Sequence, residues 1–542
     1  MTEHAVHPPI QIGSSQANPI EFEIFKNLLV SIPEEMGVTL RRTGFSPNIK
    51  ERLDYSCAIY NDRGDTIAQG DHMPVHLGAM PLSVASAIAY GQLEPGDAIM
   101  LNDPYRGGTH LPDITLVTPI FLDDERQPAF FSASRAHHSD VGGMAAGSMP
   151  LAREVFQEGL IIPPVKLLQR GTINRDVMNL LLANVRTPLE REGDVTAQIA
   201  ANRIGERRLL EAVRKYGRQT VNAYAVGMQE YTERIIQAAI RDLRDGEYRF
   251  EDWLDDDGMT TAPQRIAVTV TISGNRAVVD FTGSAPQVAG NVNANYAITL
   301  SASLYVFRCL VRGDVPYNAG LGRAIQVIAP EGTVVNARSP AAVAGGNVET
   351  SQRITDVLFG ALAAAAPDRI PAASQGTMNN VTLGGVDPRS GRPFAYYETI
   401  GGGMGARPSA DGLSGVHTHM SNTRNTPVEA LEHVLPVRVR RYALRRHSGG
   451  DGRFRGGDGI IREYELLTET NVTILSERRK GRPYGLAGGN PGQSGTNVLI
   501  KNGVEEVLPS KVAFKACEGD RLRIETPGGG GYGPAHPTER SK

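Results

Sequence analysis

The chain has very few cysteines and no long apolar segment. Cys57, Cys309 and Cys517 are the only three cysteines in 542 residues, they lie far apart, and no CxxC pair occurs. This excludes a disulfide framework and a zinc–thiolate site, and it favours a reducing compartment. No apolar run reaches the roughly 18 residues of a membrane span, and the N-terminus lacks the basic and apolar regions of a secretion signal. We therefore expect a cytoplasmic protein.

The sequence also lacks a strong charge of either sign and any phosphate-binding loop. The formal net charge is -3, with a pI of about 6.5 and no long basic block, so nucleic acid is not an expected partner. No GxxxxGK[ST] pattern occurs. The segment GGGMGAR at 401–407 has the glycines of a dinucleotide fingerprint but neither its strand–helix–strand context nor its downstream acidic residue. No Rossmann or P-loop unit is expected.

Glycine, by contrast, is abundant. The chain contains 60 glycines, about 11% of its residues, against a usual level near 7%. They gather in clumps such as GGG at 401–403, RGGDG at 455–459 and PGGGG at 527–531, between apolar segments rather than in a low-complexity tail. This pattern indicates tight turns and close backbone approaches instead of a flexible linker.

Helix and strand patterns are mixed without a regular strand–helix alternation. Apolar spacing predicts a helix over 20–43 that breaks or restarts at Pro33, and amphipathic helices over 172–244. The last 110 residues or so are strand-like and rich in turns. We therefore predict a mixed α+β fold with several interwoven β-sheets and packed helices. We expect four regions: an N-terminal α/β region with the hairpin described next (1–171), a helical region (172–260), a central α/β region (261–425) and a C-terminal β-rich, glycine-rich region (426–542).

Two short segments carry most of the candidate metal ligands. NDPYRGGTHLPD contains His110 and Asp113, and SRAHHSDVGG contains His137 and His138. The strand-like runs DITLVTPIFL and PAFFSASRAH, with DDERQ between them, predict an antiparallel hairpin that returns the chain to its starting end. His137 should therefore lie beside Asp113. Together with His110 these residues would form a two-histidine, one-carboxylate site, with His138 as a further or alternative ligand.

Such a site suits a borderline divalent metal, and the spacing does not choose between zinc, manganese and iron. The ion would lower the pKa of a bound water and polarise a carbonyl oxygen. Asp140 or Asp103, which are close in sequence, would orient the site or act as a general base. The alternative interpretation is ordinary structure, in which these side chains cap turns or lie at strand ends.

Other polar residues are candidates for the walls of a substrate pocket. His72 and His76 are four residues apart and would share a helix face. We expect these two histidines and Arg135 to line the pocket, with satisfied core or turn residues as the alternative. His417 and His419 alternate as on one strand face, either toward a substrate or within a buried polar network.

Five long motifs then carry a resemblance to a known family. In chain order they are LNDPYRGGTHLPD, SRAHHSDVGG, GGGMGARPSADGLSGVHTHMSNTRNTPVE, SGGDGRFRGGDGIIREYE and TPGGGGYG. The chain resembles the hydantoinase B/oxoprolinase family, which includes the B subunits of ATP-dependent N-methylhydantoinases and related subunits of caprolactamase and of acetone and acetophenone carboxylases. The resemblance implies that a His, an Asp three residues later and a His on the next strand bind the metal. These correspond to His110, Asp113 and His137.

The resemblance also implies a partner. Members of this family work with a separate hydantoinase A-type subunit that has an actin-like fold and binds ATP and Mg. That subunit is thought to phosphorylate the amide oxygen, or bicarbonate and the ketone in the carboxylases. Because resonance stabilises an amide, phosphorylation of its oxygen would make the ring a better electrophile.

From these observations we expect the metal-containing B subunit of a two-component, ATP-dependent cyclic-amide hydrolase in an A2B2-type heterotetramer. Its substrate would be a hydantoin, a lactam or 5-oxoproline. The alternatives are a subunit of an ATP-dependent ketone carboxylase, a non-catalytic scaffold for the ATP-binding partner, and a stand-alone metallohydrolase.

Overall fold

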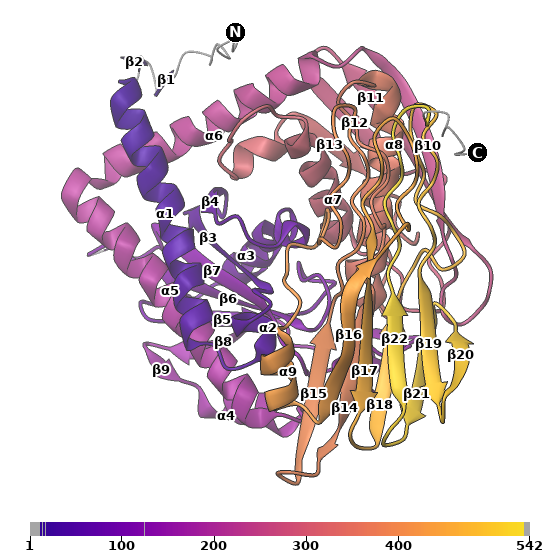
Figure 1. Cartoon of the computed structure of the whole chain (residues 1–542). Helices are drawn as coiled ribbons and strands as arrows, with labels where there is room; N and C mark the ends of the chain where they lie inside the picture. The colour runs from indigo at the N-terminus through magenta and orange to yellow at the C-terminus, as the bar shows by residue number, and fades with distance from the viewer. Residues whose placement is uncertain (1–10, 13–14, 17, 124, 536–542) are drawn as a thin grey trace.

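The computed structural model describes residues 11–12, 15–16, 18–123 and 125–535 (Figure 1). Within these ranges the chain is a mixed α+β fold whose sheets are joined by long helices and by closely spaced loops, and it contains no Rossmann or P-loop unit, as predicted. Besides four larger sheets there is a two-stranded pair, β1 (Gln11–Ile12) and β2 (Ser15–Gln16). The division into four regions stays a prediction.

A seven-stranded sheet occupies the N-terminal part, in the order β4-β3-β7-β6-β5-β8-β9. Its strands are β3 (Tyr55–Asn61), β4 (Thr66–Gln69), β5 (Ala98–Leu101), β6 (Asp113–Ile120), β7 (Phe130–His137), β8 (Val165–Gln169) and β9 (Thr172–Ile173). β6 and β7 form the predicted antiparallel hairpin, with Asp113 opposite His137. Every residue of both strands is buried, because helices cover both faces of the sheet.

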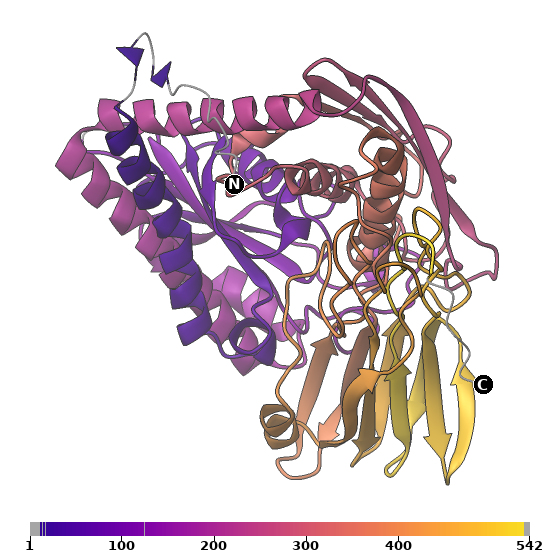
Figure 2. The same ribbon diagram turned by 45° about the horizontal axis from the view of Figure 1, so that its top comes forward.

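Helices pack against this sheet from two sides (Figure 2). One face carries α1 (Pro19–Thr43) and α5 (Pro188–Tyr216), and the other carries α3 (Ala79–Ala89). The other helical elements of this part are α2 (Pro47–Lys50), η1 (Pro74–His76), η2 (Val155–Gln157), α4 (Arg175–Ala183) and α6 (Arg218–Arg241). The helices α4, α5 and α6 confirm the helical pattern over 172–244.

The predicted break at Pro33 is wrong, because α1 continues through it. Proline removes one helical hydrogen bond and crowds the preceding turn, at a cost of about 3 kcal/mol. Here Pro33 is buried, and its neighbours Leu29, Ile32 and Met36 are fully buried in a core shared with α5 and β3. Burying several large side chains contributes more than the local cost of the proline.

The central part combines a second sheet with two buried helices. The four strands, in the order β10-β11-β12-β13, are β10 (Gly246–Leu254), β11 (Gln264–Ser273), β12 (Arg276–Asp280) and β13 (Ile325–Ile328). The helical elements are α7 (Tyr296–Cys309), η3 (Ala319–Gly322), the π-helix η4 (Gly346–Thr350) and α8 (Ser351–Ala365). α8 packs against α7 and against β10 and β11. This places η4, which leads directly into α8, in the interior.

Two further sheets form a sandwich in the C-terminal part (Figures 1 and 2). Their orders are β15-β14-β18-β21 and β16-β17-β22-β19-β20. The elements are β14 (Asn380–Asp387), β15 (Arg392–Glu398), α9 (Val428–Val434), β16 (Val437–Arg445), β17 (Gly459–Leu466), β18 (Thr470–Leu475), β19 (Thr496–Lys501), β20 (Val504–Leu508), β21 (Lys511–Ala516) and β22 (Arg521–Glu525). One apolar core lies between the sheets and includes residues from both.

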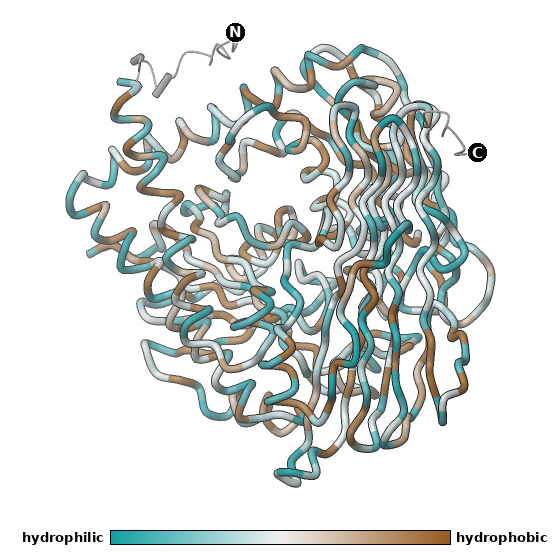
Figure 3. The backbone as a smooth tube through the Cα atoms, viewed as in Figure 1, coloured by the Kyte–Doolittle hydropathy of each residue, from teal (hydrophilic) through white to brown (hydrophobic). Residues whose placement is uncertain are grey.

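Glycine-rich segments lie side by side above this sandwich, where Figure 3 shows them as pale, closely spaced tubes. We call segments 401–406, 448–457, 489–493 and 527–533 the glycine bundle. Its backbones bond across segments: Gly457 N donates to Met404 O at 2.8 Å, and Gly529 N donates to Gly457 O at 2.9 Å. A Cβ on Gly529 would lie 2.1 Å from Met404 O. The close backbone approaches predicted from the glycine clumps are confirmed.

A buried ionic contact ties β21 to the central part. The ammonium of Lys511 lies 2.5 Å from the Glu477 carboxylate and 3.3 Å from that of Asp256, and the side chains of Lys511 and Glu477 are fully buried. Burial lowers the pKa of Lys511, but Glu477 and Asp256 outweigh it and the net pKa is raised. Lys511 therefore neutralises two acids that have little access to water.

Replacing Lys511 by methionine is expected to lower the free energy of unfolding by about 3 kcal/mol, because two carboxylates lose a fully buried cation and keep only one other cation each within the described chain. Urea denaturation of the variant measures this. Lys515→Met is the matched control on the same strand, since the Lys515–Glu469 pair is exposed (61% and 63%) and such pairs contribute less than about 1 kcal/mol. Equal effects of the two substitutions would contradict the argument.

Candidate metal centre

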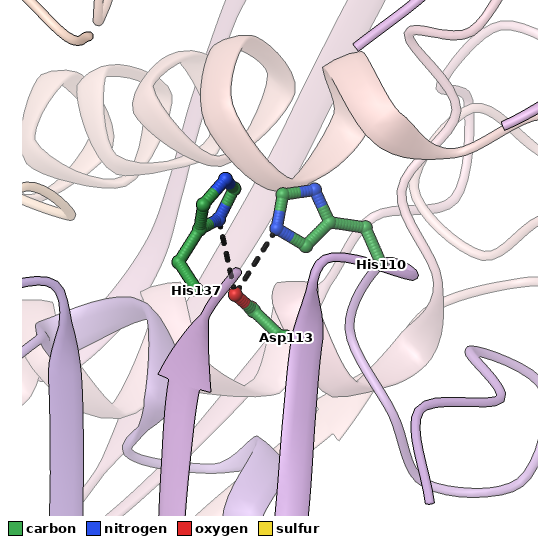
Figure 4. A group of neighbouring side chains, drawn as sticks. All are labelled: His110, Asp113 and His137. Atoms are coloured by element: carbon green, nitrogen blue, oxygen red, sulfur yellow. Dashed lines mark ion pairs between the residues drawn. The ribbon is translucent and has the colours of Figure 1, made fainter. Parts of the chain in front are cut away.

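Three predicted ligands come together at one end of the seven-stranded sheet. His110 lies in the loop before β6, Asp113 is the first residue of β6, and His137 is the last residue of β7. His110 Nε2 lies 3.2 Å and His137 Nδ1 lies 3.3 Å from the same oxygen, Asp113 Oδ1. Figure 4 shows the three side chains turned toward one another. All three are buried, and one donor atom from each lies within 4.8 Å of the others.

The alternation of the strand decides between the two neighbouring histidines. Successive side chains of a strand point to opposite faces. His137 points to the face shared with Asp113, whereas His138 points toward α5, where its Nε2 lies 2.9 Å from Gln198 Oε1. The group formed by His110, Asp113 and His137 therefore does not include His138.

Two of the three separations among the donor atoms match those of ligands on one divalent ion. Asp113 Oδ1 is buried without a hydrogen bond, although two imidazole nitrogens lie near it. Two ligands bound about 2.1 Å from one ion are separated by roughly 3.0–3.4 Å, and the observed 3.2 and 3.3 Å fall in this range. The second oxygen, Oδ2, accepts a 2.5 Å hydrogen bond from Thr109 Oγ1 and so fixes the carboxylate.

Two of the three residues have pKa values shifted by their surroundings. Burial tends to raise the pKa of Asp113, but His110 and His76 outweigh it and hold that pKa well below its ordinary value. Burial lowers the pKa of His137 and His76, with Asp113 opposing in both. The shifts of Asp113 and His137 are in the direction that coordination needs, because a carboxylate binds a cation when ionised and an imidazole binds it when neutral.

Residues distant in sequence complete the walls of the site. Asn347, in the π-helix η4, places its Nδ2 3.0 Å from His110 Nε2. The ring of Tyr397 stacks on His137 at 4.4 Å, and its hydroxyl donates to Asn380 Oδ1 at 2.8 Å. Asp54 lies on the neighbouring strand end. None of these three residues was predicted from the sequence, and only Asp54, at a strand end before an apolar run, offered a signal there.

The three residues predicted to line a substrate pocket lie at different places relative to the His–Asp–His group. His76 Nε2 lies 3.3 Å from Asp113 Oδ2, so it belongs to the site. His72 precedes η1, so the two histidines do not share a helix face; it borders a surface pocket of about 230 Å³. Arg135 is buried beneath the loop of His110, where it donates to Thr115 Oγ1 and to Ser83 Oγ at 2.8 and 2.7 Å.

The predicted catalytic carboxylates are engaged elsewhere. Asp140 accepts hydrogen bonds from Arg186, and Asp103 accepts one from the backbone of Tyr105 and lies 3.4 Å from Arg106. Neither belongs to the three-residue group, and their catalytic role stays a prediction. The His417 ring bonds to Ser421 Oγ at 3.0 Å, and His419 lies against Tyr305 and Phe359.

Glu158 supports the segment that leads into η4 and should make stability depend on pH. Its Oε1 accepts from the backbone of Val343 and Ala344 at 2.9 and 2.8 Å, while its Oε2 is buried without a hydrogen bond. Burial raises the pKa of Glu158 to about 8 from 4.5. The folded protein therefore holds a proton that the unfolded chain has released, so the stabilisation is complete below about pH 4.5 and is lost as pH rises through about 8.

Accordingly, Glu158→Gln should flatten the fall in unfolding free energy between about pH 5 and 8, where one such group contributes up to about 1.4 kcal/mol per pH unit. Chemical denaturation of both proteins across this range measures the difference between them. Glu506→Gln, at an exposed position on β20, should leave the wild-type slope unchanged. If the stability curves of Glu158→Gln and of the wild type stay parallel across this pH range, Glu158 does not carry this proton.

The fold and the site define a class: a mixed α+β protein with a buried His–Asp–His group at the end of a seven-stranded sheet. The particular family follows from comparison with known proteins. Residues 18–535 match the family described as hydantoinase B/oxoprolinase, and the chain belongs to that family. None of the helices in the described ranges is both long and apolar enough to cross a bilayer.

Known enzymes are among the proteins that the chain is similar to in sequence or structure. The chain is 39% identical to 5-oxoprolinase 1 of Arabidopsis thaliana over 97% of its own length, but spans only 42% of that longer protein. Its structure is similar to the ATP-dependent caprolactamase from Pseudomonas jessenii, with a TM-score of 0.89, 30% identity and coverage of 96% and 92% of the two chains. It shares its fold with an acetone carboxylase chain, with a TM-score of 0.88, 19% identity and coverage of 95% and 76%.

Proposed function

We propose that this chain is the metal-containing B subunit of a two-component, ATP-dependent cyclic-amide hydrolase that opens a hydantoin, lactam or 5-oxoproline ring. The buried group of His110, Asp113 and His137 is the observation that carries the proposal. Relatives named 5-oxoprolinase and ATP-dependent caprolactamase support the substrate class. A cyclic amide is the chemical group common to those names.

In this proposal His110, Asp113 and His137 hold one divalent ion: zinc, manganese or iron. When bound, the ion supplies Lewis acidity to a carbonyl oxygen and to a water. The protein contributes orientation. Thr109 and His76 fix the second oxygen of Asp113, and Tyr397 fixes the ring plane of His137. The nearly complete burial of these residues keeps bulk water from the reacting group.

ATP chemistry is assigned to a separate hydantoinase A-type subunit that binds ATP and Mg. One observation supports this assignment. The chain spans about two fifths of the 5-oxoprolinase it matches, so that relative carries a second large portion with no counterpart here. We propose an A2B2-type heterotetramer.

Purification of the chain with its ATP-binding partner, followed by elemental analysis and an ATPase screen, tests the proposal. We expect about one equivalent of zinc, manganese or iron per chain, and ATP hydrolysis stimulated by a cyclic amide without bicarbonate. ATP consumption that requires both a ketone and bicarbonate would instead identify a carboxylase subunit, whose fold the chain shares. Ring opening without ATP would identify a stand-alone hydrolase.

A further inference from the structure

Asn347 lies in the wall of the His–Asp–His group and belongs to the π-helical turn η4. Such turns are rare overall but occur frequently at functional sites. Close packing fixes this one: Gly346 N donates to Asn291 O at 3.0 Å, and a Cβ on Gly346 would lie 1.8 Å from Asn293 O. Asn347 itself is only 4% exposed. Its side chain therefore has a fixed place beside the proposed ligands.

The side-chain amide of Asn347 has one polar contact within the described chain. Its Nδ2 lies 3.0 Å from His110 Nε2, and its Oδ1 is buried without a hydrogen bond. The same His110 nitrogen lies 3.2 Å from Asp113 Oδ1, so it is the one turned toward the other proposed ligands (Figure 4). A ring nitrogen that coordinates an ion has neither a hydrogen nor a lone pair left for a further bond. Coordination by His110 and its contact with Asn347 therefore exclude one another.

When His110 coordinates an ion, both ends of the Asn347 amide lack a partner among the described residues. A buried polar group without a hydrogen bond costs free energy, so its retention points to a partner that arrives with a bound molecule. A side-chain amide carries a donor NH₂ and an acceptor oxygen next to each other. A cyclic amide presents the complementary pair, because a small ring closes only with the cis amide, in which C=O and N–H lie on the same edge.

We propose that Asn347 recognises the cis amide of the ring, with its Nδ2 donating to the amide oxygen and its Oδ1 accepting from the ring N–H. This rests on the proposed function and narrows its substrate class to cyclic amides with hydrogen on the ring nitrogen. Open-chain amides are trans, so their C=O and N–H point in opposite directions and cannot make both bonds. Asn347 is then a binding and specificity residue that touches the substrate.

The first measurement follows metal binding instead of turnover, on the complex with the ATP-binding partner. Because the contact with Asn347 must break before His110 coordinates, Asn347→Ala should bind zinc about two- to tenfold more tightly than the wild type, which is the worth of one hydrogen bond. Competition with a chelator measures the affinity. A residue that only orients a metal ligand acts in the opposite direction, since its loss weakens metal binding about 10- to 100-fold.

The second measurement uses the zinc-loaded complex and three probes: 5-oxoproline, hydantoin and ε-caprolactam. Each is compared with its analogue methylated on the amide nitrogen next to the reacting carbonyl. Asn347→Ala should lower kcat/KM about 100-fold for the N–H form of an accepted probe, because two hydrogen bonds worth up to about tenfold each are lost. Turnover of the N-methyl analogue, low in the wild type, should change by less than about threefold, because its methyl group already prevents the pair.

Two further variants separate recognition from folding. Asn347→Ser is a milder change that keeps a polar side chain but cannot make the pair, and it should show the same pattern with wild-type thermal unfolding. Thr355→Ala is the matched control, because Thr355 is a buried polar residue on α8 whose hydroxyl donates to Ser351 O at 3.0 Å. It should leave zinc affinity and the ratio of N–H to N-methyl turnover at wild-type values.

Weaker zinc binding in Asn347→Ala, equal losses on N–H and N-methyl forms, or no loss on either, would overturn the role of Asn347 while the proposed function stands. If the wild-type complex opens none of the three rings, the proposed function fails before any variant is compared, and this inference fails with it.

Discussion

Asp113→Ala is expected to abolish metal binding, leaving less than about one tenth of an equivalent per chain, and to reduce turnover with the ATP-binding partner at least about 1,000-fold. Asp113 Oδ1 is the atom that both His110 and His137 approach, so its removal takes away the centre of the ligand set. A 1,000-fold loss corresponds to about 4 kcal/mol of transition-state stabilisation, within what a Lewis-acid metal supplies. Elemental analysis and ATP-coupled ring opening measure the two effects.

Asp113→Asn refines this expectation. It keeps the side-chain shape and the contact with Thr109 but removes the negative charge, and it should also lose the metal. Asp97, which precedes β5 at the far end of the sheet and pairs with Lys166 at 2.8 Å, gives the control: Asp97→Asn should keep both metal and turnover. If Asp113→Ala lost its metal yet retained full turnover with the partner, the chain would be a scaffold and the metal would have no part in the reaction.

Gly529→Ala is expected to lower the free energy of unfolding by more than about 4 kcal/mol, enough to prevent accumulation of folded protein. The added Cβ would lie 2.1 Å from Met404 O and 2.3 Å from Met404 C, and both are backbone atoms. A flexible side chain could turn away, but Met404 cannot, because its carbonyl also accepts from Gly457 N. Such a collision exceeds the usual 1–3 kcal/mol of core overpacking.

The control for this substitution is Gly481→Ala, in the same C-terminal part. Its nearest contacts for a new Cβ are side-chain atoms at 3.5 Å or more, which are ordinary van der Waals distances. It should change stability by less than about 1 kcal/mol, as followed by soluble yield and by denaturant unfolding. Comparable behaviour of the two alanine variants would show that the glycine bundle tolerates side chains.

The pair of Asp113 and His137 could be predicted from the sequence because both residues belong to one short hairpin. Asp113 and His137 flank one hairpin, and antiparallel pairing alone brings its ends together. To choose between His137 and His138, one must know the register in which β6 pairs with β7, because a shift of one residue would exchange the sheet faces that the two histidines occupy. The mixed α+β class followed from the irregular mixture of helix and strand patterns, and the family comparison agrees with the resemblance carried by the five motifs.

The rest of the site depends on contacts that no short pattern contains. Asn347 and Tyr397 reach the histidines from positions more than 200 residues later, and nothing near either residue in sequence indicates this. To predict that Asp54 lies beside the site, one must know that β3, rather than β5, lies next to β7. The break expected at Pro33 failed for the same reason, because burial against distant elements outweighed a local preference.

The position of η4 affects how the proposed ion would reach its site. The sheet that carries His110, Asp113 and His137 is complete in the first 173 residues, but Asn347 and Tyr397 cover the group only after the later parts have docked. A cation would have open access to the partly folded chain and would be enclosed in the finished one. We therefore expect loading to accompany biosynthesis, and exchange in the mature protein to be slow, at the rate at which the docked parts transiently separate.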